Sequence, residues 1–424
     1  MKRIIKIKQI IILSLFVTLM NNAEAQTNFI FGKQFGSDND GVAYNPVTDQ
    51  YGNVYISGDT KGSFAGNNVG KSDGFVTKFD STGNIIWTKQ FGTSEDDIIN
   101  WLAIDSKDNL YVTGYTNGVL NKKNFGNEDI LVAKFDTTGT IAWQKQYGSD
   151  STDVGNKIYL DIQGNIYVAG ATKGLMGKTS FGKTDCVILK LDNSGNLIWT
   201  NQFGSNEQDE CIGITGDIAS NIYVCGYTTG DLAAKYKGKG DAFIGKFTDN
   251  GEQVKLFQIA TEELEILTNI IVDNKNNIYT GGWTSGNYGS KHQGKGDSFL
   301  LKINENMETI WSHQFGTSEG DGINGIALSE EIPDDIVISG CQNWPNSCQS
   351  FIRVYKKDGT LISVNNFVAH GTNGGTCGKG LCIDNKGNIY HTGNTGGNLF
   401  KSIDKAEGHD IFLIKLGLDQ SRIN

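Results

Sequence analysis

The stretch NLYVTG, residues 109–114, decides the fold because the chain repeats it along nearly its whole length. Copies of its Asn-x-Tyr core begin at Asn53, Asn109, Asn165, Asn221, Asn277 and Asn388, and a degenerate copy begins at Asp335. Each copy ends in a glycine: Gly58, Gly114, Gly170, Gly226, Gly282, Gly340 and Gly393. Successive glycines are 56, 56, 56, 56, 58 and 53 residues apart, which indicates a repeat architecture.

One repeat, residues 97–147, predicts four short strands at 97–105, 109–115, 129–136 and 140–147. We name these strands A to D in chain order. β-branched and aromatic runs fill them, and Asp, Asn and Gly occupy the turns between them, which is typical of hairpins. Four antiparallel strands in each repeat are the content of a propeller blade.

The two chain ends predict how the ring closes. The sequence contains seven copies of strands A, B and C, but the last copy lacks a strand D. An unassigned strand D, FGKQFG at residues 31–36, precedes its next copy by 56 residues. We therefore predict an all-β, seven-bladed β-propeller of four-stranded antiparallel blades. The N-terminal strand should join the last blade and so remove the open edge of the array.

Residues 1–25 predict a secretory signal peptide, with a basic start, the apolar run 10–20 and the small-residue site Ala23-Glu24-Ala25. Residues 26–424 should then form a single propeller domain without a transmembrane segment, secreted or held in the cell envelope. Removing the signal takes away four basic charges and one acidic charge, so the net charge changes from −10 to about −13. Nucleic acid is therefore not an expected partner.

The phrase Asp-x-x-Gly-Asn-x-Tyr-x-x-Gly at residues 161–170 resembles the SBBP-type beta-propeller repeat of bacterial exported proteins. The phrase Asp-x-Phe-x-x-Lys-x-Asp-x-x-Gly-x-x-x-Trp at residues 73–87 resembles the same repeat. The resemblance covers nearly all of residues 26–424. It implies export and a binding or scaffold role rather than a defined reaction.

The loops that connect strands D to A are acidic and suggest a metal site. The A–B and C–D turns are short and uniform, whereas the B–C and D–A loops on the other face are longer and more variable, so we expect any ligand there. A ring of carboxylates on that face could hold calcium, the one cofactor that the pattern suggests. Alternatively, each carboxylate caps its own loop by accepting backbone N–H bonds. The candidate metal ligands are Asp97, Asp153, Asp209 and Asp321.

Aromatic residues in the B–C loops are the candidate ligand-binding residues: Phe125, Phe181, Tyr236 and Tyr288. Exposed rings beside carboxylates could stack on sugars, and the alternative is that they pack one loop onto the next. The seven cysteines leave at least one thiol unpaired in a monomer. We predict a disulfide between Cys341 and Cys348, and Cys377 with Cys382 is a weaker candidate pair.

The sequence favours a non-enzymatic binding or scaffold propeller, expected to be monomeric, for a protein or glycan ligand. The five histidines match no metal signature, and no catalytic residue can be assigned. The alternative function is a polysaccharide lyase or hydrolase with acidic residues at the ring axis. That alternative would gain support if His370, Cys377 and His391 converged on the axis of the variable face.

Overall fold

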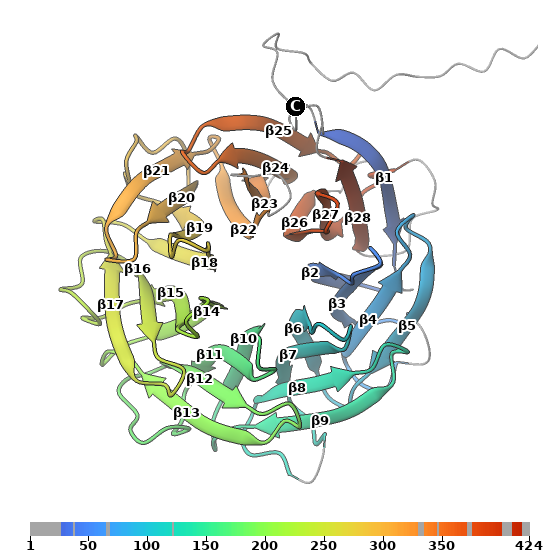
Figure 1. Cartoon of the computed structure of the whole chain (residues 1–424), viewed down its shortest axis with the longest axis horizontal. Helices are drawn as coiled ribbons and strands as arrows, with labels where there is room; N and C mark the ends of the chain where they lie inside the picture. Colours follow the sequence, from blue (N-terminus) through green and yellow to red (C-terminus); the bar gives the residue numbers. More distant parts are fainter. Residues whose placement is uncertain are drawn as a thin grey trace, which may run out of the picture.

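A computed structural model describes residues 27–417, apart from 37–38, 65–67, 121–122, 330–334, 346, 371–374 and 401–408. The described residues form seven four-stranded antiparallel sheets arranged in a ring (Figure 1). This confirms the all-β, seven-bladed propeller. The predicted signal peptide at 1–25 lies outside the described residues.

The strands of each blade run outward from the axis in the order A, B, C, D (Figure 1). The inner A strands are β2 (Gly41–Thr48), β6 (Asp97–Ile104), β10 (Asp153–Leu160), β14 (Asp209–Gly216), β18 (Glu265–Val272), β22 (Gly320–Leu328) and β26 (Thr376–Ile383). The B strands are β3 (Val54–Thr60), β7 (Leu110–Thr116), β11 (Ile166–Thr172), β15 (Ile222–Thr228), β19 (Ile278–Thr284), β23 (Asp335–Trp344) and β27 (Asn388–Thr395). The C strands are β4 (Asp73–Phe79), β8 (Asp129–Phe135), β12 (Asp185–Leu191), β16 (Asp241–Phe247), β20 (Asp297–Ile303), β24 (Gln349–Lys356) and β28 (Asp410–Gly417). The outer D strands are β5 (Ile85–Phe91), β9 (Ile141–Tyr147), β13 (Leu197–Phe203), β17 (Gln253–Ile259), β21 (Thr309–Phe315), β25 (Leu361–Phe367) and β1 (Asn28–Phe35).

We number the blades by their inner strands, so that β2 belongs to blade one and β26 to blade seven. Blade seven takes its outer strand from the start of the chain. Strand β1 pairs antiparallel with β28, from Asn28 opposite Gly417 to Phe35 opposite Ile411. The first described strand thus covers an edge that the last C strand would otherwise expose.

The repeated glycine follows from close contact between strands A and B. A β-bulge interrupts each A strand at the same register, as between Ile99 and Trp101 in blade two. A Cβ atom on Gly114 would lie 1.8 Å from the carbonyl oxygen of Ile98. Real side chains do not tolerate that distance, so glycine is required where strand B passes the bulge.

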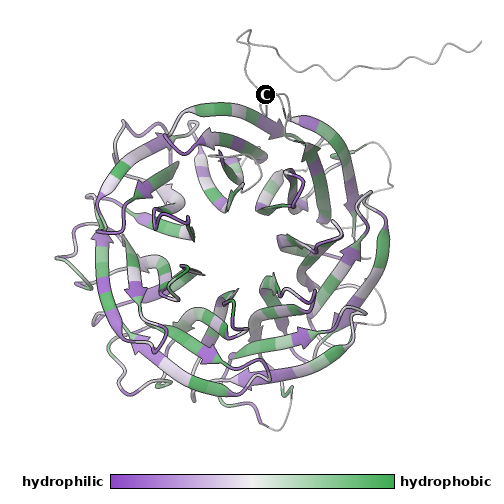
Figure 2. Ribbon diagram, in the orientation of Figure 1, coloured by the Kyte–Doolittle hydropathy of each residue, from purple (hydrophilic) through white to green (hydrophobic). Residues whose placement is uncertain are grey.

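The hydrophobic core is divided among the seams between neighbouring blades. One buried cluster joins Tyr55 and Val76 of blade one to Leu102 and Leu131 of blade two. Figure 2 shows hydrophobic and hydrophilic stretches following one another along the outer strands, whereas strands β7 and β8 of blade two are buried at all positions but one each. Each blade therefore buries its faces against two neighbours, and the buried hydrophobic residues described by the structure form seven clusters, one at each seam.

A tyrosine–lysine pair ties strand B to strand C in six blades. In blade two, the Lys134 ammonium lies 4.9 Å from the Tyr111 ring centroid, and the Tyr111 hydroxyl donates to Asp105. Blade six has Val337 and Val354 at the corresponding paired positions. It is the most divergent repeat, as its degenerate sequence indicates.

Candidate functional site

A hollow of about 300 Å³ opens on the variable face where blades three and four meet. Inner strands β10 and β14 contribute Val154, Asp209 and Glu210 to its wall, so it lies near the ring axis. Its remaining lining residues are Glu128, Thr152, Ala171, Lys173, Thr184, Gln208 and Tyr227. We call it the mouth pocket.

Two groups in the mouth pocket are held in fixed positions. The Asn156 side-chain amide donates to Glu210 Oε1 at 3.0 Å and anchors this carboxylate. Burial, together with the Glu210 carboxylate to which its hydroxyl is hydrogen-bonded, raises the pKa of Tyr227 to about 12. Tyr227 therefore stays protonated near neutral pH and donates its hydroxyl proton to Glu210 in a hydrogen bond, so both groups present acceptor oxygens to a ligand. With the exposed Lys173 on the rim, the pocket can bind a polar ligand through both donors and acceptors.

A larger hollow lies on the opposite face, where we expected no site. It measures about 830 Å³ and opens between blades five and six. Lys356 begins the C–D turn of blade six, at the position that Asp192 holds in blade three. With Lys275, Lys302 and Lys357 in the lining, this hollow carries more basic charge than acidic charge.

The four candidate metal ligands lie at the starts of inner strands in four different blades and are buried. Each carboxylate accepts a backbone N–H from its own D–A loop. The donors are Thr93 to Asp97 (2.5 Å), Ser149 to Asp153 (2.6 Å), Ser205 to Asp209 (2.6 Å) and Thr317 to Asp321 (2.7 Å). Burial raises the pKa of all four, and a carboxylate of the preceding blade, Asp73 for Asp97, adds to the effect.

These contacts support the loop-capping alternative for the aspartates. Within the described residues, the one group of three potential metal ligands that gathers closely is made of cysteines. The structure therefore does not bring the four aspartates together, and calcium binding stays a prediction.

The four candidate aromatic residues do not form one surface. Phe125 and Phe181 occupy equivalent positions in blades two and three and are 42% and 47% exposed. Tyr236 of blade four lies one residue before the equivalent position and is half-buried. Tyr288 packs inward, with its ring 5.8 Å from that of Phe299. Phe125 and Phe181 thus remain available to a ligand, whereas Tyr288 follows the packing alternative.

The predicted disulfide partner of Cys341 is wrong. Cys341 on β23 is bonded to Cys377 on β26 of the next blade, with 5.1 Å between their Cα atoms. Cys348 lies in the connection between β23 and β24 and keeps a free thiol. The Cys341 side chain points across the seam, where its Sγ lies 3.5 Å from the Gly378 carbonyl oxygen. Pairing across a seam depends on the ring and has no signal in local spacing.

His370 and His391, which lie in the last part of the chain, do not converge on the ring axis. His391 is fully buried on strand β27, where its Nδ1–H donates to the Gly380 carbonyl at 2.8 Å. Its Nε2 accepts from the Ser350 hydroxyl at 2.5 Å, and burial lowers its pKa to about 4. His370 instead pairs through its backbone with Asn398. The observation that would have favoured an enzyme is therefore not found.

Side chains at the inner bulges hydrogen-bond one blade to the next around the axis. Asn100 donates to the Gly155 carbonyl, Asn156 to that of Cys211 and Asn324 to that of Gly378. The buried Lys157 ammonium reaches across to the Thr268 carbonyl at 2.8 Å and lies 4.0 Å from the Trp101 ring centroid. No pattern in the sequence marks Lys157, because its repeat position carries no shared signal.

A family model described as the SBBP beta-propeller repeat matches residues 86–121, 142–175 and 198–233. The chain is a propeller that contains SBBP repeats in these three segments. The matched segments run from the D strand of one blade to the B–C loop of the next.

The chain is also similar in sequence to parts of two longer proteins. It is 24% identical over 165 residues to the regulatory protein FlaEY of Caulobacter vibrioides, which covers 35% of this chain and 17% of FlaEY. It is 22% identical over 210 residues to a WD repeat-containing protein of Acanthamoeba polyphaga mimivirus, covering 40% of this chain and 15% of that protein. The chain thus spans less than a fifth of the length of these relatives.

Among solved structures, the periplasmic gluconolactonase PpgL of Pseudomonas aeruginosa resembles the SBBP chain with a TM-score of 0.51 at 11% identity. The likeness covers 89% of this chain and 99% of that one, and it shows the fold alone. The described part of the SBBP chain has no helix with the length and apolar character of a membrane span.

Proposed function

We propose that this protein is a non-enzymatic propeller that binds a glycan through the mouth pocket. The observation that carries the proposal is the pocket itself, which combines the anchored Glu210 carboxylate with the Tyr227 hydroxyl near the axis of the variable face. Sugar hydroxyls both donate and accept hydrogen bonds, so they suit this mixture. The volume of about 300 Å³ is at the small end of the range for ligand pockets and has room for a single sugar ring.

Binding fits the charge states better than catalysis does. A lyase needs a base that is partly deprotonated at the working pH, and a Tyr227 pKa of about 12 opposes that role. Two carboxylates, Glu128 and Glu210, do line the same pocket, and this is the observation that favours a hydrolase as the second candidate. The exported location expected from the sequence is compatible with both, and a protein ligand remains the alternative partner.

The test is a thermal-shift screen of the protein against oligosaccharides, calcium and a chelator. A ligand at 100 times its dissociation constant should add about 2.7 kcal/mol to the free energy of unfolding. Glu210→Gln and Tyr227→Phe should weaken binding of a glycan hit at least about tenfold, since each removes a polar contact. Glu263→Gln changes an exposed ion pair with Lys239 in the D–A loop before blade five, outside the pocket lining, and serves as the control.

Any glycan hit should also be tested for turnover. Cleavage that is lost in both Glu128→Gln and Glu210→Gln would replace the binding function with the hydrolase. A glycan response that both pocket variants leave unchanged, or a screen in which glycans give no response, would refute the mouth pocket as a glycan site. A response to calcium alone would support structural metal binding instead.

A further inference from the structure

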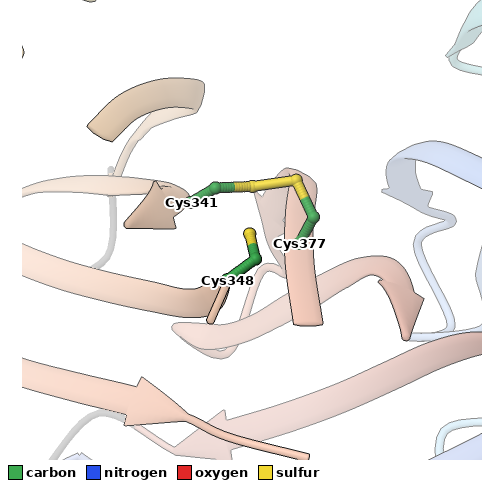
Figure 3. A group of neighbouring side chains, drawn as sticks. All are labelled: Cys341, Cys348 and Cys377. Carbon is green, nitrogen blue, oxygen red and sulfur yellow. A yellow bond between two sulfur atoms is a disulfide. The ribbon is translucent and has the colours of Figure 1, made fainter. Parts of the chain in front are cut away.

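Three sulfur atoms meet at the seam between blades six and seven. The Sγ atoms of Cys341, Cys348 and Cys377 all lie within 4.8 Å of one another. Cys341 and Cys377 form the disulfide, and Figure 3 shows the Cys348 side chain beside that bond. The disulfide links two blades, whereas Cys341 and Cys348 belong to the same blade.

The backbone holds Cys348 in this position. Its carbonyl accepts the Thr376 N–H at 2.7 Å, and Thr376 immediately precedes Cys377 on β26. Cys348 is buried, so its thiol is kept next to the disulfide rather than in bulk solvent. The free thiol is thus a fixed neighbour of both bonded sulfur atoms.

We propose that these cysteines form a thiol–disulfide exchange site in which Cys348 displaces Cys377 from Cys341. The Cys348 thiol loses its proton to solvent, and the resulting thiolate attacks Cys341 Sγ. The Cys341–Cys348 bond forms as the Cys341–Cys377 bond breaks, and Cys377 leaves as a thiolate that takes up a proton. One disulfide and one thiol exist before and after the step, so no oxidant or reductant is consumed.

The surroundings favour Cys377 as the leaving group. Cys377 is the partly exposed member of the trio, so water can solvate its thiolate, whereas Cys341 is buried. Burial raises the pKa of the Cys348 thiol to about 11, Asp321 adds to the rise, and the Lys379 ammonium opposes it. Exchange should therefore be slow at neutral pH. Its rate should rise about tenfold with each unit of increase in pH, up to about pH 11.

Exchange changes which parts of the ring are covalently joined. In the described arrangement, the crosslink fastens blade six to blade seven, the blade in which β1 closes the ring. After exchange, the crosslink lies inside blade six, and the seam is held by packing and hydrogen bonds alone. The site thus sets whether the seam next to the closing blade is covalent.

The experiment maps disulfides by peptide mass spectrometry in the full chain, incubated at pH 7, 8 and 9 and then quenched with acid and an alkylating agent. We expect the Cys341–Cys348 linked peptide to appear in the wild type at a rate that rises about tenfold per pH unit. Cys348→Ser should retain the Cys341–Cys377 peptide alone. Cys377→Ser should form the Cys341–Cys348 bond in a glutathione redox buffer. The melting temperature of this variant, compared with that of the wild type, measures how much the crosslink across the seam stabilises the ring.

The wild type decides the outcome. If pH 9 incubation leaves Cys341–Cys377 as the sole linkage and Cys348 fully alkylated, exchange does not occur, whatever the variants show. A Cys341–Cys348 peptide whose rate of appearance does not change with pH would contradict attack by the Cys348 thiolate. Cys186 lies in another blade beside Cys211, so a peptide that links Cys186 to one of the three cysteines would reveal scrambling during digestion.

Discussion

His391 should make the stability of the propeller depend on pH in a way that one substitution removes. The ring is fully buried and neutral, and burial lowers its pKa from 6.5 to about 4. Because the folded pKa lies below the unfolded one, the unfolded chain binds more protons between these values. The stability contribution of His391 is therefore complete above pH 6.5 and is lost as the pH falls toward 4.

The magnitude follows from the two pKa values. The difference between the unfolded pKa of 6.5 and the folded pKa of about 4 corresponds to about 3 kcal/mol of unfolding free energy over the full pH range. About 2 kcal/mol of this stability should be lost between pH 7 and pH 5. Other buried groups act in the opposite direction. Burial raises the pKa of Asp59 to about 7, so its contribution grows as the pH falls. The wild-type profile alone therefore does not isolate His391.

The assay is denaturant unfolding of the wild type and His391→Gln at pH 7 and pH 5. Glutamine does not titrate, and the contributions of all other groups cancel when the two proteins are compared at each pH. We expect the variant to be destabilised at pH 7, since it gives up the contacts of His391 with Ser350 and Gly380. That deficit should shrink by about 2 kcal/mol at pH 5. A deficit equal at both pH values would refute the buried, neutral state of His391.

Three further predictions concern the scaffold. Burial lowers the pKa of Lys157 to about 7, so Lys157→Met should be more stable than the wild type near pH 6.5. The difference in free energy of unfolding should be about 2 kcal/mol smaller at pH 9, and denaturant unfolding at both pH values checks this. Gly114→Ala places a Cβ atom 1.8 Å from the Ile98 oxygen and should cost about 3 kcal/mol or more, whereas an unchanged melting temperature would contradict the close contact. Removing residues 26–36 takes away β1 and should lower the melting temperature in calorimetry, and a shortened chain that melts like the full chain would show that the closure does not stabilise the ring.

The fold could be predicted from sequence because its cause is local and is repeated. The carbonyl that excludes a side chain at Gly114 recurs at the same register in every blade, so the same glycine recurs in the chain. The strand boundaries in residues 97–147 were predicted to within one residue for the same reason. The N-terminal strand was recognised because it carries the repeated pattern without a blade of its own.

The site could not be predicted in the same way. Glu210 and Tyr227 are close neighbours in the mouth pocket, but neither is marked by the repeat. Cys341 is bonded to a residue 36 positions away, across a seam, rather than to the cysteine seven positions away in its own blade. Lys157 reaches a carbonyl 111 residues distant, two blades further along the ring. Such contacts depend on the curvature of the ring, which period and spacing do not encode.

The pairing of β1 with β28 also determines how the ring would respond to mechanical force. Asn28 pairs with Gly417, so the chain enters and leaves the propeller at the same end of one strand pair. A pull between these two residues would break the backbone hydrogen bonds one after another, as in a zipper. A pull between Asn28 and the opposite end of β28 would instead shear all of them at once. The closure is therefore expected to yield at low force when Asn28 and Gly417 are pulled apart.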